Sequence, residues 1–303
     1  MKDPGRLVDV VLWALGDADE EGCSSDEKWE QAMGLLRRIG PDVVLLSGSK
    51  LAETGQIDLG MPGAVSAPSG EDGEERDRTA VGVAINPEVF SAAGAAETRS
   101  RAWWDNPVRM PVELNIAPGA GELHVVSFSM CQHAAGWREG EAGWLTGLVR
   151  DGAVILAGGP TASYPQQRDH KIMLPDFSTS GDAVQRAHRT RTDGLGWWAD
   201  TVPDAVLAGG DPAVYQDLAR YAARHCKLPD AVDPTVAANA VRDAGQRTTR
   251  VYGSGGVAGA VHSVVLLPET DTRRISPHRL VITRLHLDRL VRLLSERSPT
   301  PAV

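Results

Sequence analysis

Short runs of mostly apolar residues, many of them β-branched, recur along this chain and alternate with segments of helical periodicity. The runs cover residues 8–14, 43–46, 81–85, 153–157 and 280–287. Apolar runs of about four to eight residues bounded by turn signals are typical of buried strands. Because strands and helices alternate, the sequence predicts an α/β domain in which helices cover the faces of one or more sheets.

Capping and turn residues indicate where helices begin. Ser25 or Asp26 can cap a helix that runs to about residue 39, where Gly40-Pro41 follows. Asp211-Pro212 predicts a second helix that runs to about residue 225, with the aspartate as cap and the proline in the first turn. Further helices are expected at about residues 139–150 and 288–297.

Composition and length favour a single domain over residues 1–303, with a flexible loop at about residues 52–78 that is rich in Gly, Pro, Ser and acids. The net charge of -9 argues against a protein built to hold nucleic acid, since phosphate binding is driven by clustered Lys and Arg. No apolar run of about 18 residues predicts a membrane span, and no signal-peptide pattern is present at the N-terminus. A cytoplasmic location is the resulting expectation.

Seven segments carry short motifs in a fixed order: residues 8–14, 41–48, 123–129, 138–142, 154–162, 247–252 and 276–278. The first ends in Trp13-Ala14 and the last is Ser276-Pro277-His278. Together they resemble the endonuclease/exonuclease/phosphatase superfamily, whose matching motifs include Trp-Asn, Gln-Glu, Gly-Asp-Phe-Asn-Ala and Ser-Asp-His. The resemblance implies a two-sheet α/β sandwich, in which mixed sheets are flanked by helices.

The resemblance also implies that the chemistry of that family is lost. Its members hydrolyse phosphate esters around a hard divalent cation, usually Mg²⁺, which needs anionic oxygen ligands, and a carboxylate orients a catalytic His. Only His278 remains here. Small or neutral residues stand at the other matched positions, which are Ala14, Gly48, Ser129, Gly159, Thr161, Thr249 and Pro277. The sequence therefore predicts no metal, no cofactor and no Mg²⁺-dependent nuclease or phosphatase activity.

Two functions are compatible with such a degenerate active site. In the first, a pseudoenzyme binds a partner protein or a small ligand. In the second, an enzyme carries out new, metal-independent chemistry, in which His278 is the general acid or base and Ser129, Thr161 or Cys131 contributes a hydroxyl or thiol. The wide separation of Cys23, Cys131 and Cys226 predicts neither a disulfide framework nor a metal site.

If a small ligand binds, it is expected over Gly48 and Gly159, with polar contacts from His278 and Ser129. One residue of Trp103-Trp104 would form a wall, and the ligand would be neutral or anionic because no matched carboxylate remains to attract a cation.

Three other groups of residues have two interpretations each. His133, His170 and His188 could bind a metal if they converge, but their spacing favours exposed loop positions. Arg186, Arg189 and Arg191 form either a basic patch or part of a solvated loop. One tryptophan of each pair, Trp103-Trp104 and Trp197-Trp198, is expected in the core, while the other can line a cleft.

Overall fold

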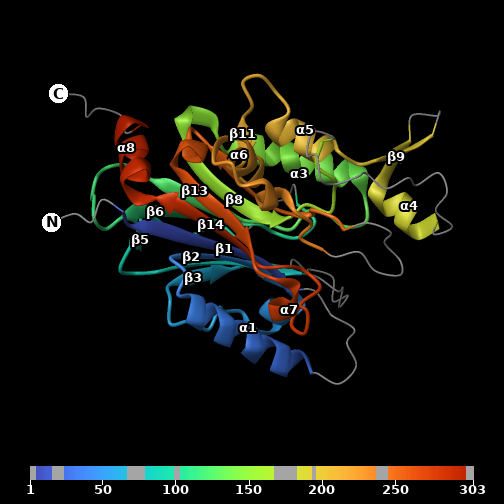
Figure 1. Cartoon of the computed structure of the whole chain (residues 1–303), viewed down its shortest axis with the longest axis horizontal. Coiled ribbons are helices and arrows are strands. Elements are labelled where there is room, and N and C mark those ends of the chain that lie inside the picture. Colours follow the sequence, from blue (N-terminus) through green and yellow to red (C-terminus); the bar gives the residue numbers. More distant parts are fainter. Residues whose placement is uncertain are drawn as a thin grey trace.

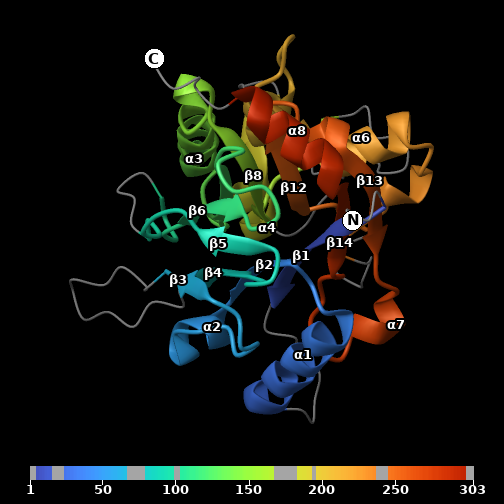
Figure 2. The same cartoon turned by 90° about the vertical axis from the view of Figure 1, so that its left-hand side faces the viewer.

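Two mixed sheets face each other and helices cover both outer faces, as Figures 1 and 2 show. This computed structural model describes residues 5–15, 24–66, 79–98, 103–166, 183–192, 196–236 and 245–297. The two-sheet α/β sandwich predicted from the sequence is confirmed. No helix in these ranges is both long and apolar enough to cross a membrane.

The first sheet is built around β1, which pairs in parallel with β2 and antiparallel with β14. Its strands lie in the order β13-β14-β1-β2-β4-β3. Their bounds are Val261–Leu266 for β13, Val281–His286 for β14, Leu7–Leu15 for β1, Val43–Gly48 for β2, Ala80–Ile85 for β4 and Gly63–Val65 for β3.

The second sheet contains one parallel pair, β7 with β8, and its other pairs are antiparallel. Its order is β11-β12-β8-β7-β6-β5. The bounds are Tyr215–Asp217 for β11, Thr249–Ser254 for β12, Val154–Pro160 for β8, Leu123–Ser127 for β7, Val108–Leu114 for β6 and Phe90–Ala92 for β5. A separate hairpin pairs β9 (Thr190–Thr192) with β10 (Trp197–Ala199).

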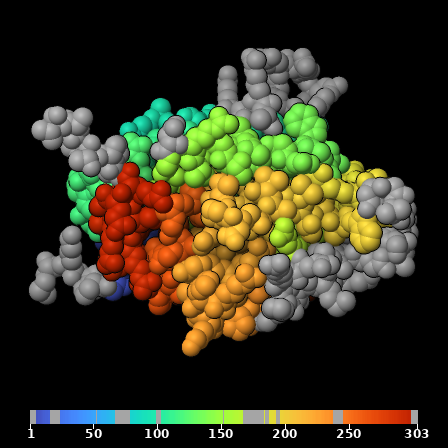
Figure 3. Space-filling model, turned by 90° about the horizontal axis from the view of Figure 1, so that it is seen from above, coloured from blue at the N-terminus to red at the C-terminus, as the bar shows by residue number. Residues whose placement is uncertain are grey.

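Helices close the sandwich on both sides. The helix α1 (Ser25–Ile39) packs on the first sheet, and α3 (Ala135–Gly147) and α5 (Val202–Ala208) pack on the second. In Figure 3 the gold and orange segment around α6 and the red α8 lie on the same face. The remaining helices are α2 (Ser49–Thr54), α4 (Ala183–Arg189), α6 (Leu218–His225), α7 (Glu269–Thr272) and α8 (Leu287–Arg297), with 3₁₀ turns at Arg150–Gly152, Pro229–Val232 and Val257–Ala260.

Alternation along the strands decides which residues face the space between the sheets. In β1, Val10 and Leu12 contribute to the core between the sheets, whereas Val11 and Trp13 pack with α1. The same alternation in β8 directs Leu156 inward and Ala157 toward α3 and α5. Because successive side chains point to opposite faces, every second residue at the strand ends opens onto one end of this space.

Two helix starts differ from the sequence predictions. The cap of α1 is Ser24, whose hydroxyl accepts from the Glu27 amide while the Glu27 carboxylate accepts from the Ser24 amide. The start predicted at Asp211-Pro212 is wrong, because residues 215–217 pair with β12 as β11. The helix α6 begins after Asp217, whose carboxylate accepts two backbone N–H groups.

The loop predicted over residues 52–78 is only partly a loop. It overlaps the end of α2, and it contains β3, which pairs with β4. Residues 67–78 lie outside the described part of the chain. The predicted helix 139–150 begins earlier, as α3 at Ala135, and ends at Gly147.

Candidate functional site

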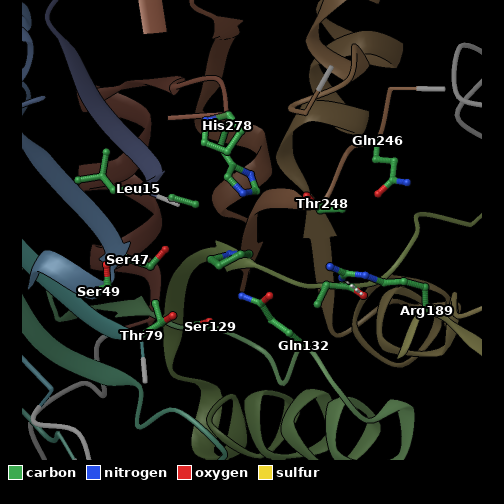
Figure 4. A pocket seen from close by; sticks show the side chains of 14 residues that line it. Leu15, Ser47, Ser49, Thr79, Ser129, Gln132, Arg189, Gln246, Thr248 and His278 are labelled. Carbon is green, nitrogen blue, oxygen red and sulfur yellow. Dashed lines mark hydrogen bonds between the residues drawn. The ribbon is translucent and has the colours of Figure 1, made fainter. Parts of the chain in front are cut away.

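An open cavity of about 370 Å³ lies where strands of both sheets end (Figure 4). Hydroxyl, amide, imidazole and guanidinium groups dominate its polar lining. In Figure 4 the side chains of His278, Gln132 and Ser47 point toward the same space. The lining comprises Ala14, Leu15, Ser47, Ser49, Thr79, Ser129, Gln132, Pro160, Ala162, Arg189, Gln246, Thr248, Pro277 and His278.

His278 is held at the cavity by its backbone. Its carbonyl accepts from Trp13 Nε1 at 2.9 Å, and its amide donates to Ser276 Oγ at 3.0 Å. Ser276 in turn donates to the Ala14 carbonyl at 2.7 Å, so two hydrogen bonds, from Trp13 and from Ser276, join the segment before β14 to the end of β1. The imidazole Nδ1 lies 3.4 Å from Thr249 Oγ1. A neutral hydroxyl thus occupies the place beside the imidazole where the resemblance implies a carboxylate.

Gly48 and Gly159 do not line this cavity. A Cβ on Gly48 would lie 2.7 Å from the Leu15 carbonyl oxygen, and one on Gly159 would lie 1.8 Å from the Phe128 carbonyl oxygen. Their neighbours Ser47 and Pro160 face the cavity instead. A ligand in this cavity would therefore lie against Ser47 and Pro160 and not over the two glycines, because successive residues of β2 and β8 point to opposite faces of their sheets.

The hydroxyl candidates differ in their partners. Thr161 Oγ1 donates to the Thr248 carbonyl at 2.9 Å and is buried outside the cavity lining. Ser129 is fully buried at the cavity, and its Oγ has no hydrogen-bond partner among the described residues. Leaving a buried hydroxyl unpaired costs about 1–3 kcal/mol. A bound molecule that accepts a hydrogen bond from Ser129 Oγ would therefore remove this cost.

Replacing Ser129 by alanine is expected to leave the free energy of unfolding unchanged or to raise it by up to about 1 kcal/mol, because an unpaired buried hydroxyl is removed. The matched variant Thr161→Val is expected to lower it by about 1 kcal/mol, because a formed hydrogen bond is lost. Urea denaturation of the two purified variants measures both changes. Destabilisation by Ser129→Ala equal to that by Thr161→Val would show that Ser129 has a structural partner.

Cys131 lies just beyond Ser129 but is not among the residues that line the cavity. It is fully buried, its amide donates to Glu141 Oε2 and its carbonyl accepts from Arg138. Burial raises the pKa of the Cys131 thiol, which disfavours the thiolate that a nucleophile requires. Burial also raises the pKa of Glu141 to about 7, although its oxygens accept from the amides of Trp104 and Cys131.

The tryptophan pairs are placed differently from each other. Trp103 is buried against Phe128 and Trp144, and neither it nor Trp104 is among the residues that line the cavity. The predicted wall is therefore formed by other residues. Trp197 and Trp198 are 43% and 59% exposed, so the expectation of one core residue in this second pair is wrong.

Two of the three candidate histidines meet. The rings of His133 and His188 are 5.1 Å apart, while His170 lies outside the described residues. In the described part of the chain, no group of three or more His, Cys, Asp or Glu side chains is arranged to hold a metal ion.

A buried ion-pair network supports one wall of the cavity. Arg138 and Asp200 have fully buried side chains, with Arg138 Nε donating to Asp200 Oδ2 at 2.8 Å. Arg138 also donates to the carbonyls of Cys131 and His188. These two carbonyls directly precede Gln132 and Arg189, which line the cavity. The network thus fixes the backbone that carries two polar groups of the site.

Of the three arginines near His188, Arg189 and Arg191 have described side chains, and neither belongs to a simple solvated loop, whereas the side chain of Arg186 lies outside the description. Arg189 ends α4 and lines the cavity, whereas Arg191 lies on β9 and donates to Asp200 and Glu139. Sequence reasoning identified this basic group but not its division between the cavity and the network. It missed Gln132 and Gln246, since their positions depend on how connecting segments fold over the strand ends.

Solved structures from several sources resemble this fold. A D. rerio TDP2 complexed with a single-strand DNA product matches with a TM-score of 0.56 and 12% identity, over 92% of this chain and 98% of that one. An endonuclease/exonuclease/phosphatase from Bacteroides vulgatus matches with a TM-score of 0.60 and 9% identity, over 92% of this chain and 98% of that one. An endonuclease/exonuclease/phosphatase family protein from Bacteroides thetaiotaomicron matches with a TM-score of 0.58 and 11% identity, over 93% of this chain and 95% of that one. The chain has the endonuclease/exonuclease/phosphatase fold. No family model and no curated protein sequence matches it.

The resemblance to the endonuclease/exonuclease/phosphatase superfamily implies a divalent cation, and the described donors of this cavity do not fit one. Mg²⁺ is bound by hard oxygen ligands, with one or two carboxylates as the usual protein ligands. The described lining residues include no carboxylate, and Arg189 adds a positive charge. The hydroxyls of Ser47 and Ser129 are neutral and would not compensate the dehydration of the cation.

Proposed function

We propose that this protein binds a small polar molecule in the cavity and does not hydrolyse phosphate esters by a metal-dependent route. The observation that supports the proposal is the lining itself, whose described residues contribute neutral hydrogen-bonding groups and one guanidinium where strand ends of both sheets meet. Its volume of about 370 Å³ lies in the range of small-molecule pockets, roughly 300–1,000 Å³. A concave site of this size favours a small molecule over a partner protein.

Nucleic acid is not the ligand that we propose. The chain carries a net charge of -9, and the described cavity lining contains one arginine and no lysine. Nucleic-acid binding usually depends on several Lys and Arg side chains that neutralise phosphates together. The DNA complex of the D. rerio protein therefore serves as evidence of the fold and not of the ligand.

Metal-independent catalysis is the second candidate, because His278 and Ser129 line the same cavity. An activated serine requires a base within hydrogen-bond reach. Ser129 Oγ has no hydrogen-bond partner among the described residues, so it is not paired with His278. The imidazole instead contacts Thr249 through Nδ1. Binding is the function that this geometry supports better.

A tryptophan at the cavity tests the proposal. Ser49 is exposed on the lining, so Ser49→Trp is expected to fill the space without disturbing the core. Ser91→Trp, on the exposed part of β5, is the matched control. Compounds from a small-molecule library that raise the melting temperature of the parent protein are expected to stabilise Ser91→Trp equally and Ser49→Trp much less. Mg²⁺ and Mn²⁺ are expected to give no shift that depends on the cavity.

Equal stabilisation of both tryptophan variants by every active compound would place the ligand elsewhere and contradict the proposal. A stoichiometric Mg²⁺ or Mn²⁺ site seen by calorimetry, and lost in Ser49→Trp, would contradict the claim that the protein does not use a metal-dependent route. A circular dichroism spectrum identical to that of the parent confirms that each variant is folded.

A further inference from the structure

We infer that the ligand of this cavity carries a planar aromatic ring, which lies against four protein rings beside the cavity. These four residues, His188, His133, Trp104 and Trp137, form the aromatic row. The inference rests on the proposed function, because it concerns a second part of the molecule that the cavity holds. Three observations support it: the continuity of the row with the cavity, its fixed backbone and its exposure.

The rings of the aromatic row follow one another in edge-to-face contact. The ring centroids of His188 and His133 are 5.1 Å apart, and the interplanar angle is 77°. Trp104 lies 6.3 Å from His133 and 6.1 Å from Trp137 between ring centroids, with interplanar angles of 72° and 74°. The rings come from α4, from the loop before α3, from the segment before β6 and from the first turn of α3. A further ring can join such a row in the same geometry.

The histidine end of the row is continuous with the cavity lining. Gln132 lines the cavity and directly precedes His133, and Arg189 lines it and directly follows His188. In Figure 4, the labelled Gln132 side chain extends into the cavity. A molecule that fills the cavity can therefore extend over the two histidines toward the tryptophans.

Two buried side chains of α3 fix the backbone that carries the row. The Glu141 carboxylate accepts from the amides of Trp104 and Cys131. The Arg138 guanidinium donates to the carbonyls of Cys131 and His188. Both side chains are fully buried. A binding surface whose backbone is already ordered loses less conformational entropy when a ligand binds.

The row is accessible to a ligand. Trp137 is 47% exposed and His133 is also exposed, while Trp104 and His188 are half-buried. Partial desolvation and the neighbouring His188 lower the pKa of His133, so this imidazole is neutral at neutral pH. Flat neutral rings favour a flat apolar partner, because the contact removes both from water. Continuity with the cavity favours a ring of the cavity ligand over a partner protein.

Matched probes that differ only in the ring test the inference. The pairs are benzamide with cyclohexanecarboxamide, phenylurea with cyclohexylurea, and benzyl alcohol with cyclohexylmethanol. Each pair shares a neutral polar group, and the saturated ring is the more apolar one, so hydrophobic burial alone would favour the cyclohexyl compound. Titration followed by NMR is expected to show that the phenyl member of at least one pair binds the parent protein about three- to tenfold more tightly.

Variants of the row locate the ring. His133→Leu and Trp137→Leu are expected to lower the affinity for the phenyl member to that for its cyclohexyl partner, because each removes a ring and keeps an apolar side chain. Trp198→Leu, at an exposed tryptophan of β10 outside the row, is the matched control and is expected to change neither affinity. Ser49→Trp is expected to weaken both members, since both occupy the cavity. Circular dichroism checks that each variant is folded.

The outcomes separate the inference from the proposed function. If both members of each pair bind the parent equally and Ser49→Trp blocks both, the cavity binds ligands but the inference is wrong. It is also wrong if no pair binds while library compounds still distinguish the parent from Ser49→Trp, or if folded His133→Leu and Trp137→Leu keep the phenyl preference. If no probe or library compound distinguishes the parent from Ser49→Trp, the proposed function fails as well.

Sedimentation of the parent and of Trp137→Leu tests the other occupant of the row. Both proteins are expected to have the same oligomeric state. Conversion of a dimer to a monomer by Trp137→Leu would assign the row to an interface between copies of this chain and overturn the inference.

Discussion

Replacing Asp200 by alanine is expected to lower the free energy of unfolding by about 3–5 kcal/mol. Asp200 is fully buried and accepts from both Arg138 and Arg191. Removing it leaves the Arg138 guanidinium, whose side chain is also fully buried, without its carboxylate. A buried charge that loses its partner destabilises a fold far more than the intact pair stabilises it. Urea or thermal denaturation measures the change.

Glu139→Ala provides the matched control for Asp200→Ala. Glu139 binds the same Arg191 at 2.8 Å, but its side chain is 52% exposed. Exposed ion pairs contribute about 0–1 kcal/mol, so this variant is expected to lose no more than that. Equal losses in the two variants would show that Asp200 is accessible to water and that the network is not a buried one. Asp200→Ala should also weaken cavity binding, because Arg138 then holds Cys131 and His188 less firmly.

Adding one methyl group to Gly159 is expected to lower the free energy of unfolding by about 3 kcal/mol or more. A Cβ at this position would lie 1.8 Å from the Phe128 carbonyl oxygen, and this atom belongs to the backbone. The Phe128 amide donates to the Gly158 carbonyl at 3.1 Å, so the two backbone segments cannot separate without losing that hydrogen bond. Denaturation of Gly159→Ala measures the loss.

The neighbouring Gly158→Ala is the control. A Cβ there would meet the ends of two flexible side chains, Leu45 Cδ1 at 2.6 Å and Leu12 Cδ2 at 3.3 Å. Because these side chains can rotate, the expected loss is about 1–2 kcal/mol. If Gly158→Ala were the more damaging change, the close approach of Gly159 to Phe128 would be incorrect. For the same reason, an aspartate introduced at Gly159 is not expected to restore a metal site.

The strands were the most predictable part of this protein. The apolar runs at residues 8–14, 43–46 and 81–85 became β1, β2 and β4 because a strand buried on both faces needs apolar residues throughout. The cavity was less predictable, since a ligand was expected over Gly48 and Gly159, whereas their neighbours Ser47 and Pro160 line the cavity. A shift of one residue in a strand reverses the face to which a side chain points. Inward and outward packing in the sheets decides between such neighbours.

Other parts of the site depended on contacts distant in sequence. Asp211-Pro212 has the composition of a helix start, but pairing with β12 takes residues 215–217 into the sheet first. Gln132 and Gln246 reach the cavity from connecting segments with no periodic pattern, and Arg189 reaches it from the end of α4. Arg138 donates to the His188 carbonyl, which directly precedes Arg189, and also to Asp200, which lies 62 positions after Arg138. The position of Arg189 therefore depends on this distant pairing. Local propensity contains no information on such pairings.

The place of β14 inside the first sheet has a consequence for how the chain is made. β14 lies between β13 and β1, and the hydrogen bond from Trp13 to His278 joins residues 265 positions apart. During translation, β1 leaves the ribosome long before its partner, at roughly 5–20 residues per second. For this interval one hydrogen-bonding edge of β1 lacks its native partner. The nascent chain therefore exposes an apolar strand edge that a chaperone or another strand can bind until β14 completes the sheet.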